Sequence, residues 1–297
     1  MKWNQILIGA FGLLLTSSSF GQSNLLNATT PDEIGKLSDA ELAVKKDSKP
    51  LEYGYVDDRD VLWSKNVWEI VDLDERVNFP LYYPIDTNNI GSSRRSLYDV
   101  LMTGIKSGKI KNIYADSYFN EKRTLSDISA AISKIDTTDL GVEQYNAGEE
   151  IDQQFIDRRD ITSADIAEYH IRGMWYFDKR QAELKYRILG IAPVAPDVNF
   201  IDDETPDLVE LFWVWFPDAR EILFDNNAFN GSNTSSSITF DHLLNARRFN
   251  AVIYKEDNVQ GDREVDEYIA ENAFMQLLES ERIKERIRNF EQDMWNY

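Results

Sequence analysis

The strongest constraint on this chain lies in its first 21 residues. Lys2 gives a positive start, residues 6–15 form an apolar run, and small residues follow at Ser19 and Gly21. This order is typical of a secretory signal peptide. The run is shorter than the roughly 20 apolar residues that a membrane-spanning helix needs. We therefore expect cleavage between Gly21 and Gln22 and folding outside the cytosol; the alternative is a buried N-terminal helix.

An exported chain of this composition must fold without covalent links, because it contains no cysteine. That absence excludes disulfides, thiolate metal sites, a cysteine nucleophile and a lipid attached through cysteine. A hydrophobic fraction of 42%, including 7 Trp, 14 Tyr and 15 Phe, is enough for a packed core. We expect one large domain or two smaller ones.

The formal net charge of −20 limits the partners of the chain. Such a field repels nucleic acid and anionic lipid, so we expect neither to bind. A basic partner surface would suit the charge, although acidity also keeps an exported protein in solution. Beyond the first 21 residues, the longest apolar stretch is 208–216, which Glu210 interrupts and Pro217 ends. We predict a buried strand there and no membrane span, so that a partner must hold the chain in place.

The pattern of apolar residues predicts an α+β fold in five segments. After the signal peptide at 1–21 come an extended or disordered arm at 22–58 and a first mixed α/β block at 59–136. A connector at 137–160 leads to a second block of similar size at 161–297, which ends in a long helix.

Capping residues and periodicity place the elements within the blocks. Ser96, Thr124 and Thr239 each precede an apolar run and are expected N-caps of helices. The prolines of 79–84 predict an edge-type extended segment. β-branched and aromatic residues predict strands at 109–114, 184–191, 209–216 and 251–254.

The two blocks contain similar segments in the same order. Residues 98–101 resemble 240–243, and the pair Ile113 and Tyr114 resembles residues 253–254. Identities are few, so two explanations stay open. One is an internal duplication, and the other is the chance recurrence of a capped helix followed by a strand.

Four aromatic residues are candidate partner contacts. The last predicted helix runs from about Glu264 to Trp295 and has apolar residues at helical spacing along one face. It either packs on the core or binds a partner, in which case Trp295 and Tyr297 would anchor the contact. Trp213 and Trp215 in the aromatic strand are the other two candidates, although an uninterrupted apolar strand is normally buried on both faces.

No catalytic, cofactor-binding or metal-binding residues stand out from the sequence. His170 and His242 have no partners at metal-ligand spacing, so we expect structural roles for them. Residues 86–91 begin like a calcium loop, but position 97 is not acidic, and 104–109 departs from a phosphate loop in its glycine spacing. The many carboxylates leave a glycosidase-like pair open without singling one out.

Several segments, taken together, resemble the GldN (PorN) family of gliding motility proteins. The likeness is collinear from about residue 56 to the end of the sequence. It rests on DVLWSKNVW at 60–68, YYP at 82–84, WYFDKR at 175–180, RILGIAPV at 187–194, LFWVWFPDAR at 211–220, ESERIK at 279–284 and DMWNY at 293–297.

The resemblance implies a structural role in type IX secretion and gliding motility. It implies a periplasmic subunit that self-associates in a ring at the outer membrane, with the lipoprotein GldK (PorK) as close partner. Contact with the motor proteins GldL and GldM is also implied. The family supplies no catalytic residues. The alternative from a different class is a periplasmic glycan hydrolase that uses paired carboxylates.

Overall fold

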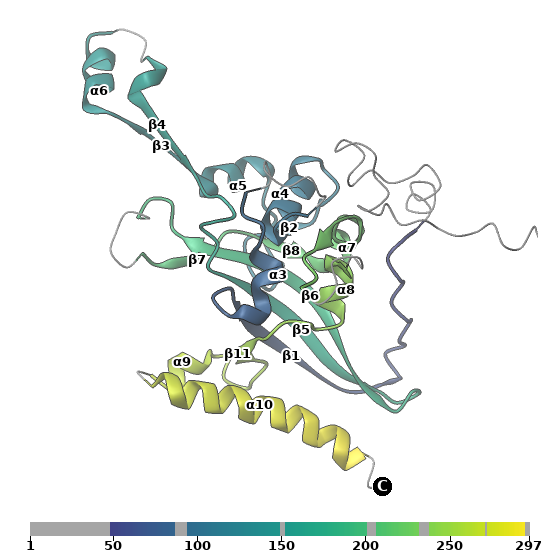
Figure 1. The fold of residues 1–297 in the computed structure, drawn as a ribbon. Helices are drawn as coiled ribbons and strands as arrows, with labels where there is room; N and C mark the ends of the chain where they lie inside the picture. The colour runs from purple at the N-terminus through teal and green to yellow at the C-terminus, as the bar shows by residue number, and fades with distance from the viewer. Residues whose placement is uncertain are drawn as a thin grey trace, which may run out of the picture. The chain divides into compact units, whose positions relative to one another are not determined.

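The computed structural model describes residues 48–86, 94–148, 152–200, 206–231, 238–270 and 272–294. Gly21, Gln22, Trp295 and Tyr297, which were singled out from the sequence, lie outside these ranges. From Pro50 onward, the described residues belong to one compact unit. Its architecture is mixed α+β with a long C-terminal helix, as the sequence predicted, and most of its strands belong to one main antiparallel sheet (Figure 1).

A seven-stranded antiparallel sheet forms the centre of this unit. Its strands are β1 (Val61–Asp72), β2 (Ile113–Tyr114), β5 (Glu168–Asp178), β6 (Glu183–Pro196), β7 (Leu208–Glu210), β8 (Trp213–Trp215) and β11 (Val252–Glu256). The order is β11-β1-β5-β6-β8-β2, and β7 pairs with the end of β6. Since β1 lies between β5 and β11, both predicted blocks contribute strands to one sheet.

The predicted strand at 209–216 is divided in the structure. β7 pairs with the end of β6, whereas β8 pairs with Gly190 and Ile191 further back along the same strand. Leu211 and Phe212 make the step between them, and the Leu211 N–H donates to the Pro193 carbonyl at 3.0 Å. Two separate pairings along one neighbour therefore explain why a continuous apolar run forms two short strands.

Eight α-helices accompany the strands in the part of the chain that the structure describes. They are α3 (Phe79–Tyr82), α4 (Leu97–Lys106), α5 (Leu125–Ile132), α6 (Asp139–Asn146), α7 (Phe216–Asp225), α8 (Phe240–Asn245), α9 (Val265–Tyr268) and α10 (Ala273–Met294). The predicted caps are confirmed: Ser96, Thr124 and Thr239 accept hydrogen bonds from the backbone of the first turn. These local side-chain bonds satisfy amides that the helix itself leaves unpaired.

The prediction of an extended segment at 79–84 was wrong, because residues 79–82 form helix α3. Pro80 lies in the first turn, where a missing amide proton costs nothing. Asn78 just before it is fully buried and holds the segment in place. Its Nδ2 donates to the Asp72 carbonyl at 2.7 Å, and its Oδ1 accepts from the Asn250 amide at 2.9 Å.

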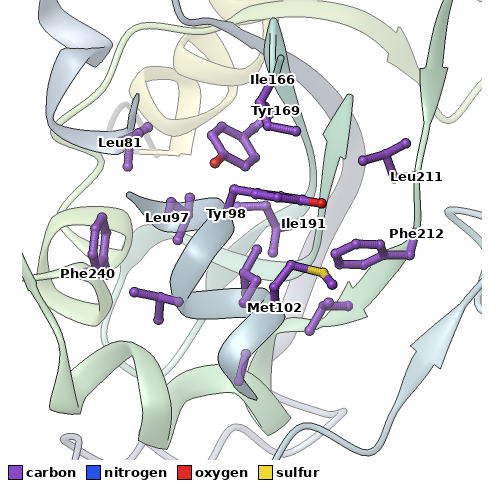
Figure 2. Close-up of a cluster of buried hydrophobic side chains, with 14 of the residues drawn as sticks. Leu81, Leu97, Tyr98, Met102, Ile166, Tyr169, Ile191, Leu211, Phe212 and Phe240 are labelled. Atoms are coloured by element: carbon purple, nitrogen blue, oxygen red, sulfur yellow. The ribbon is translucent and has the colours of Figure 1, made fainter. Parts of the chain in front are cut away.

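The largest core lies between the sheet and helices α4, α7 and α8. Alternate residues of β5, such as Tyr169 and Ile171, are buried in it, as the two-residue period of a strand requires. Figure 2 shows Tyr98 and Met102 of α4 packed among Tyr169, Ile191 and Phe212. His170 and Arg172, which alternate with Tyr169 and Ile171, belong to the opposite face of the sheet.

Helix α10 covers the outer edge of β11. Ser280 Oγ accepts from the Ile253 amide at 2.8 Å, and Lys284 Nζ donates to the Ala251 carbonyl at 2.9 Å. Ile283 and Ile287 bury their side chains beside β1 and β11. An uncovered edge strand invites pairing with other chains, so α10 protects the sheet at this end.

The predicted C-terminal helix from Glu264 is interrupted. Helix α9 ends at Tyr268, and Asn272 starts α10 anew, since its Oδ1 accepts from the Met275 amide at 3.0 Å. Leu277, on the apolar face of the predicted helix, is exposed. The restart at Asn272 therefore leaves the first turns of α10 outside the core.

Helices α4 and α8 end in the same way, which bears on the predicted duplication. Gly108 after α4 and Arg247 after α8 both have a positive φ, of 71° and 49°. Their amides donate to the carbonyls of Ile105 and Leu244, each at 3.0 Å, and a strand follows in both cases. These parallels support a duplication, which stays a prediction.

The predicted connector at 137–160 contains regular structure. Strands β3 (Ser133–Thr137) and β4 (Ile156–Asp160) form a two-stranded sheet, with α6 between them along the chain. Figure 1 shows this hairpin extending from the end of α5. Ile135, expected on the helix that Thr124 opens, belongs to β3 instead.

The described end of the predicted arm is extended and is fixed to the unit through Tyr53. Its hydroxyl donates to Asn245 Oδ1 at 2.7 Å. The ring lies 4.1 Å from the Arg220 guanidinium and 4.6 Å from that of Arg187. Leu51 is held by its carbonyl, which accepts from Arg220 Nη2 at 2.6 Å.

Candidate functional site

The face of the sheet opposite the helices carries a cluster of cations and aromatic rings. The Arg172 guanidinium lies 5.0 Å from the Trp68 ring and 5.3 Å from that of Tyr118. Lys255 Nζ is 5.3 Å from the same two rings. Arg172 also donates to the Ser117 carbonyl at 2.7 Å. Ring faces attract cations, so these contacts hold the 115–121 loop against the strands.

His170 is clamped between two carboxylates on this face. Its Nδ1 is 2.7 Å from Glu210 Oε1, and its Nε2 is 3.1 Å from Glu168 Oε1. Burial by itself disfavours the charged ring, but the hydrogen bonds to both carboxylates outweigh it and raise the pKa of His170 to about 9. The ring is therefore an imidazolium at neutral pH, and both of its nitrogens donate.

The sequence predicted a structural role for His170, because it shows no partner at metal-ligand spacing. Glu168, two positions away on the same strand, was visible as a neighbour because alternate residues share a face. Glu210 lies 40 residues further along the chain and reaches the ring only through the pairing of β6 with β7. The structure thus keeps the structural role and adds the partners that the sequence missed.

Trp213 and Trp215, the predicted partner contacts within the described residues, differ in exposure. Trp213 is fully buried and donates its indole N–H to Glu210 Oε2 at 2.7 Å. Trp215 is half-buried and packs edge-on against Phe119, with ring centroids 4.9 Å apart. Trp213 therefore serves the fold of the chain itself, while Trp215 keeps part of its ring accessible.

A second buried charge pair lies on the helix-bearing side of the sheet. Arg247 Nη1 and Nη2 donate to the two carboxylate oxygens of Glu69 at 2.9 and 2.7 Å. Tyr186 donates its hydroxyl to the same carboxylate at 2.7 Å. Burial opposes the charge on Arg247, but the hydrogen bonds to Glu69 outweigh it and raise the pKa of Arg247. Such a bidentate geometry fixes both side chains in direction as well as distance.

A pocket of about 410 Å³ opens beside this pair, between the sheet and α10. Its apolar lining comes from Trp175, Leu184, Ile253 and Ile287, and Lys284 and Arg288 lie among the charged residues at its border. The volume is at the lower end of the range for small-molecule sites. The carboxylate of Glu69 that faces the pocket is already bound by Arg247 and Tyr186.

Exposed apolar side chains gather on two elements away from the main core. One set lies on the hairpin of β3, α6 and β4 and includes Ile135, Leu140 and Tyr145. The other lies in the first turns of α10: Phe274, Met275, Leu277 and Leu278. The sequence predicted a connector for the first segment, and for the C-terminal helix it left open whether the apolar face packs on the core or binds a partner. Grouped exposed apolar residues mark interaction surfaces.

The described residues lack two features that would indicate metal binding or a membrane-spanning helix. They contain no group of three or more His, Cys, Asp or Glu side chains arranged to hold a metal ion. Among the helices that the structure describes, none combines the length and the hydropathy needed to cross a membrane.

Comparison with known proteins identifies a family. The model of a family described as gliding motility associated protein GldN matches residues 56–296. That range includes every strand of the main sheet, both buried charge clusters and helix α10. No curated protein matches the chain.

Proposed function

Since the chain belongs to the GldN family of gliding motility associated proteins, we propose that it is a structural subunit of the type IX secretion and gliding motility machinery. In this proposal it forms a ring with the lipoprotein GldK (PorK) at the inner face of the outer membrane. It also contacts GldL and the periplasmic part of GldM. The predicted signal peptide at 1–21 would deliver it to the periplasm.

The observation that carries the proposal is the family match over 56–296. It spans the complete described fold from β1 to α10 and is not confined to one motif. The two exposed apolar sets, on the β3–β4 hairpin and on α10, support a role that depends on contact with other proteins.

Co-expression with affinity-tagged GldK tests the assembly role. We expect the chain to co-purify with GldK and to resist washing, whereas a tagged unrelated lipoprotein should retain none. Crosslinking with mass spectrometry would then map the contact and show whether Trp215 or the residues at 295–297 take part. A chain that stays monomeric and unbound when GldK is present would contradict the proposal.

Cell fractionation tests the location. The chain should follow GldK into the outer-membrane fraction and should be released when GldK is deleted. A variant without residues 1–21 serves as the control and should stay in the cytosol. Recovery of the intact chain, with its first 21 residues uncut, from the cytosol of normal cells would contradict a periplasmic role.

A further inference from the structure

The hairpin of β3, α6 and β4 stands apart from the main sheet. Among the strands that the structure describes, β3 and β4 pair with each other and with no other strand, in register from Ser133 opposite Asp160 to Thr137 opposite Ile156. The hairpin joins the unit directly at the end of α5, where the Ile161 amide donates to the Ile132 carbonyl at 2.8 Å. A two-stranded ribbon by itself is marginally stable in water, so this one gains from a partner that covers it.

The hairpin keeps several apolar side chains in solvent. Tyr145 is 70% exposed, Ile135 66% and Leu140 57%, and Ile156 is also exposed. They come from both strands and from α6, so the exposure belongs to the whole projection. Exposed apolar side chains that group on one projection mark an interaction surface, and tyrosine is enriched among the residues that dominate protein interfaces.

The charge of the projection indicates what kind of partner fits. Residues 133–160 contain eight acidic residues and three basic ones, and the basic residues Lys134, Arg158 and Arg159 lie at the two ends of this segment. A second copy of this chain, with its net charge of −20, would meet the projection with the same sign. A positively charged protein surface would be attracted and steered to it.

We propose that the hairpin of β3, α6 and β4, at residues 133–148 and 152–160, forms a docking arm for a basic protein surface, in which Leu140 and Tyr145 enter an apolar recess of the partner. The arm has this role only if the chain assembles with other envelope proteins as proposed above. The acidic residues of this segment supply long-range attraction and disfavour a second copy of the acidic chain, while the two apolar side chains supply contact.

A matched pair of double variants of the full chain tests the arm. The test variant carries Leu140→Ser and Tyr145→Ser. The control carries Leu51→Ser and Tyr55→Ser. These changes replace the same residue types at positions that are 86% and 85% exposed and lie in the N-terminal segment, outside the docking arm. The probe is the envelope fraction of a strain that lacks this chain, and bound protein is measured against added concentration. Thermal melting checks that both variants fold.

We expect the wild-type chain and the control to bind alike, and the arm variant to bind at least tenfold more weakly. Raising the salt from about 50 to about 500 mM should weaken wild-type binding, because the added ions screen charges on the two surfaces. Treating the envelopes with protease should abolish it. A photo-crosslinker in place of Tyr145 should join the chain to a protein with a basic surface.

The outcomes separate the docking arm from the assembly role. If the wild-type chain does not bind the envelopes, both proposals fail. If it binds and the arm variant binds equally well, only the docking arm is overturned. Binding that ignores salt, survives protease treatment or crosslinks Tyr145 to a second copy of the chain would also overturn a basic protein as the occupant.

Discussion

The two faces of the main sheet each hold a buried cation between carboxylate and aromatic groups, but the cations differ. On the helix-bearing face, Arg247 is bound by Glu69. On the opposite face, His170 is bound by Glu168 and Glu210. Arginine stays charged at every physiological pH, whereas His170, with its pKa raised to about 9, loses its charge in alkaline solution. The ion pair of Glu69 and Arg247 is therefore insensitive to pH in this range, whereas the His170 cluster depends on pH.

In the cluster on the helix-bearing face, the backbone of Arg247 is also strained. Arg247 has a φ of 49°, a left-handed conformation that glycine adopts freely and that other residues adopt at a cost. Gly108 occupies the corresponding position after α4. After α8 the same conformation is held by an arginine whose side chain reaches Glu69, so the ion pair offsets the strain.

Removal of the Glu69 carboxylate should have the largest effect. Glu69→Gln leaves the partly buried Arg247 charge, whose side chain is 27% exposed, without its carboxylate partner. We expect this to lower the free energy of unfolding by about 3 kcal/mol, at the lower end of the range for buried pairs. Urea denaturation at neutral pH measures the change. Asp57→Asn, in an exposed pair with Arg59, is the control and should leave the urea midpoint unchanged. If the urea midpoint of Glu69→Gln equals that of the wild type, the ion pair does not stabilise the fold.

The His170 cluster should make stability depend on pH. The folded pKa of about 9 lies above the ordinary value of about 6.5. The stabilisation is therefore complete below pH 6.5 and is lost as the pH rises through 9, at most about 3 kcal/mol in all. Urea denaturation from pH 6 to 10 should show this decline in the wild type and a flatter profile for His170→Gln. Parallel profiles for the two proteins would refute the assignment.

Trp213 should matter more than Trp215. Trp213→Phe removes a buried indole and the hydrogen bond to Glu210, at a cost of about 2–3 kcal/mol in unfolding free energy. Trp215→Phe alters a half-buried ring and should cost about 1 kcal/mol or less. Thermal denaturation of the two variants side by side compares them. Equal losses would mean that the Glu210 hydrogen bond contributes nothing measurable.

Gly108→Ala measures the cost of a left-handed backbone at a position where no ion pair is involved. The added methyl group would have no heavy atom within 4 Å, so the change affects only the left-handed backbone. We expect a loss of about 1 kcal/mol in the free energy of unfolding, measured by urea denaturation. If the free energy of unfolding is unchanged, a left-handed backbone costs a non-glycine residue nothing here, and the Arg247 ion pair has no strain to offset.

Local chemistry was predictable from the sequence, and long-range pairing was not. Ser96, Thr124 and Thr239 were identified as caps because each acts on amides within three residues. The Glu69–Arg247 pair joins residues 178 positions apart and leaves no local pattern. The strand order of the sheet also depends on contacts between residues far apart in the sequence, since β1 pairs with both β5 and β11.

Two segments were misjudged because their signal was weak. The polar sequence at 137–160 lacks a clean alternation, so the β3–β4 hairpin was taken as a connector. The C-terminal helix looked continuous, because Asn272 resembles any polar residue of a solvated face until its capping bond to Met275 is seen. Both misjudged segments carry the exposed apolar side chains that now support an assembly role.

Sedimentation of the chain in the presence of GldK tests the assembly role most directly. A structural subunit of a ring should leave the position of the free 34.4 kDa chain or its processed form and move with GldK as a much larger species that contains both proteins. The same light, unassociated boundary with and without GldK would contradict the account.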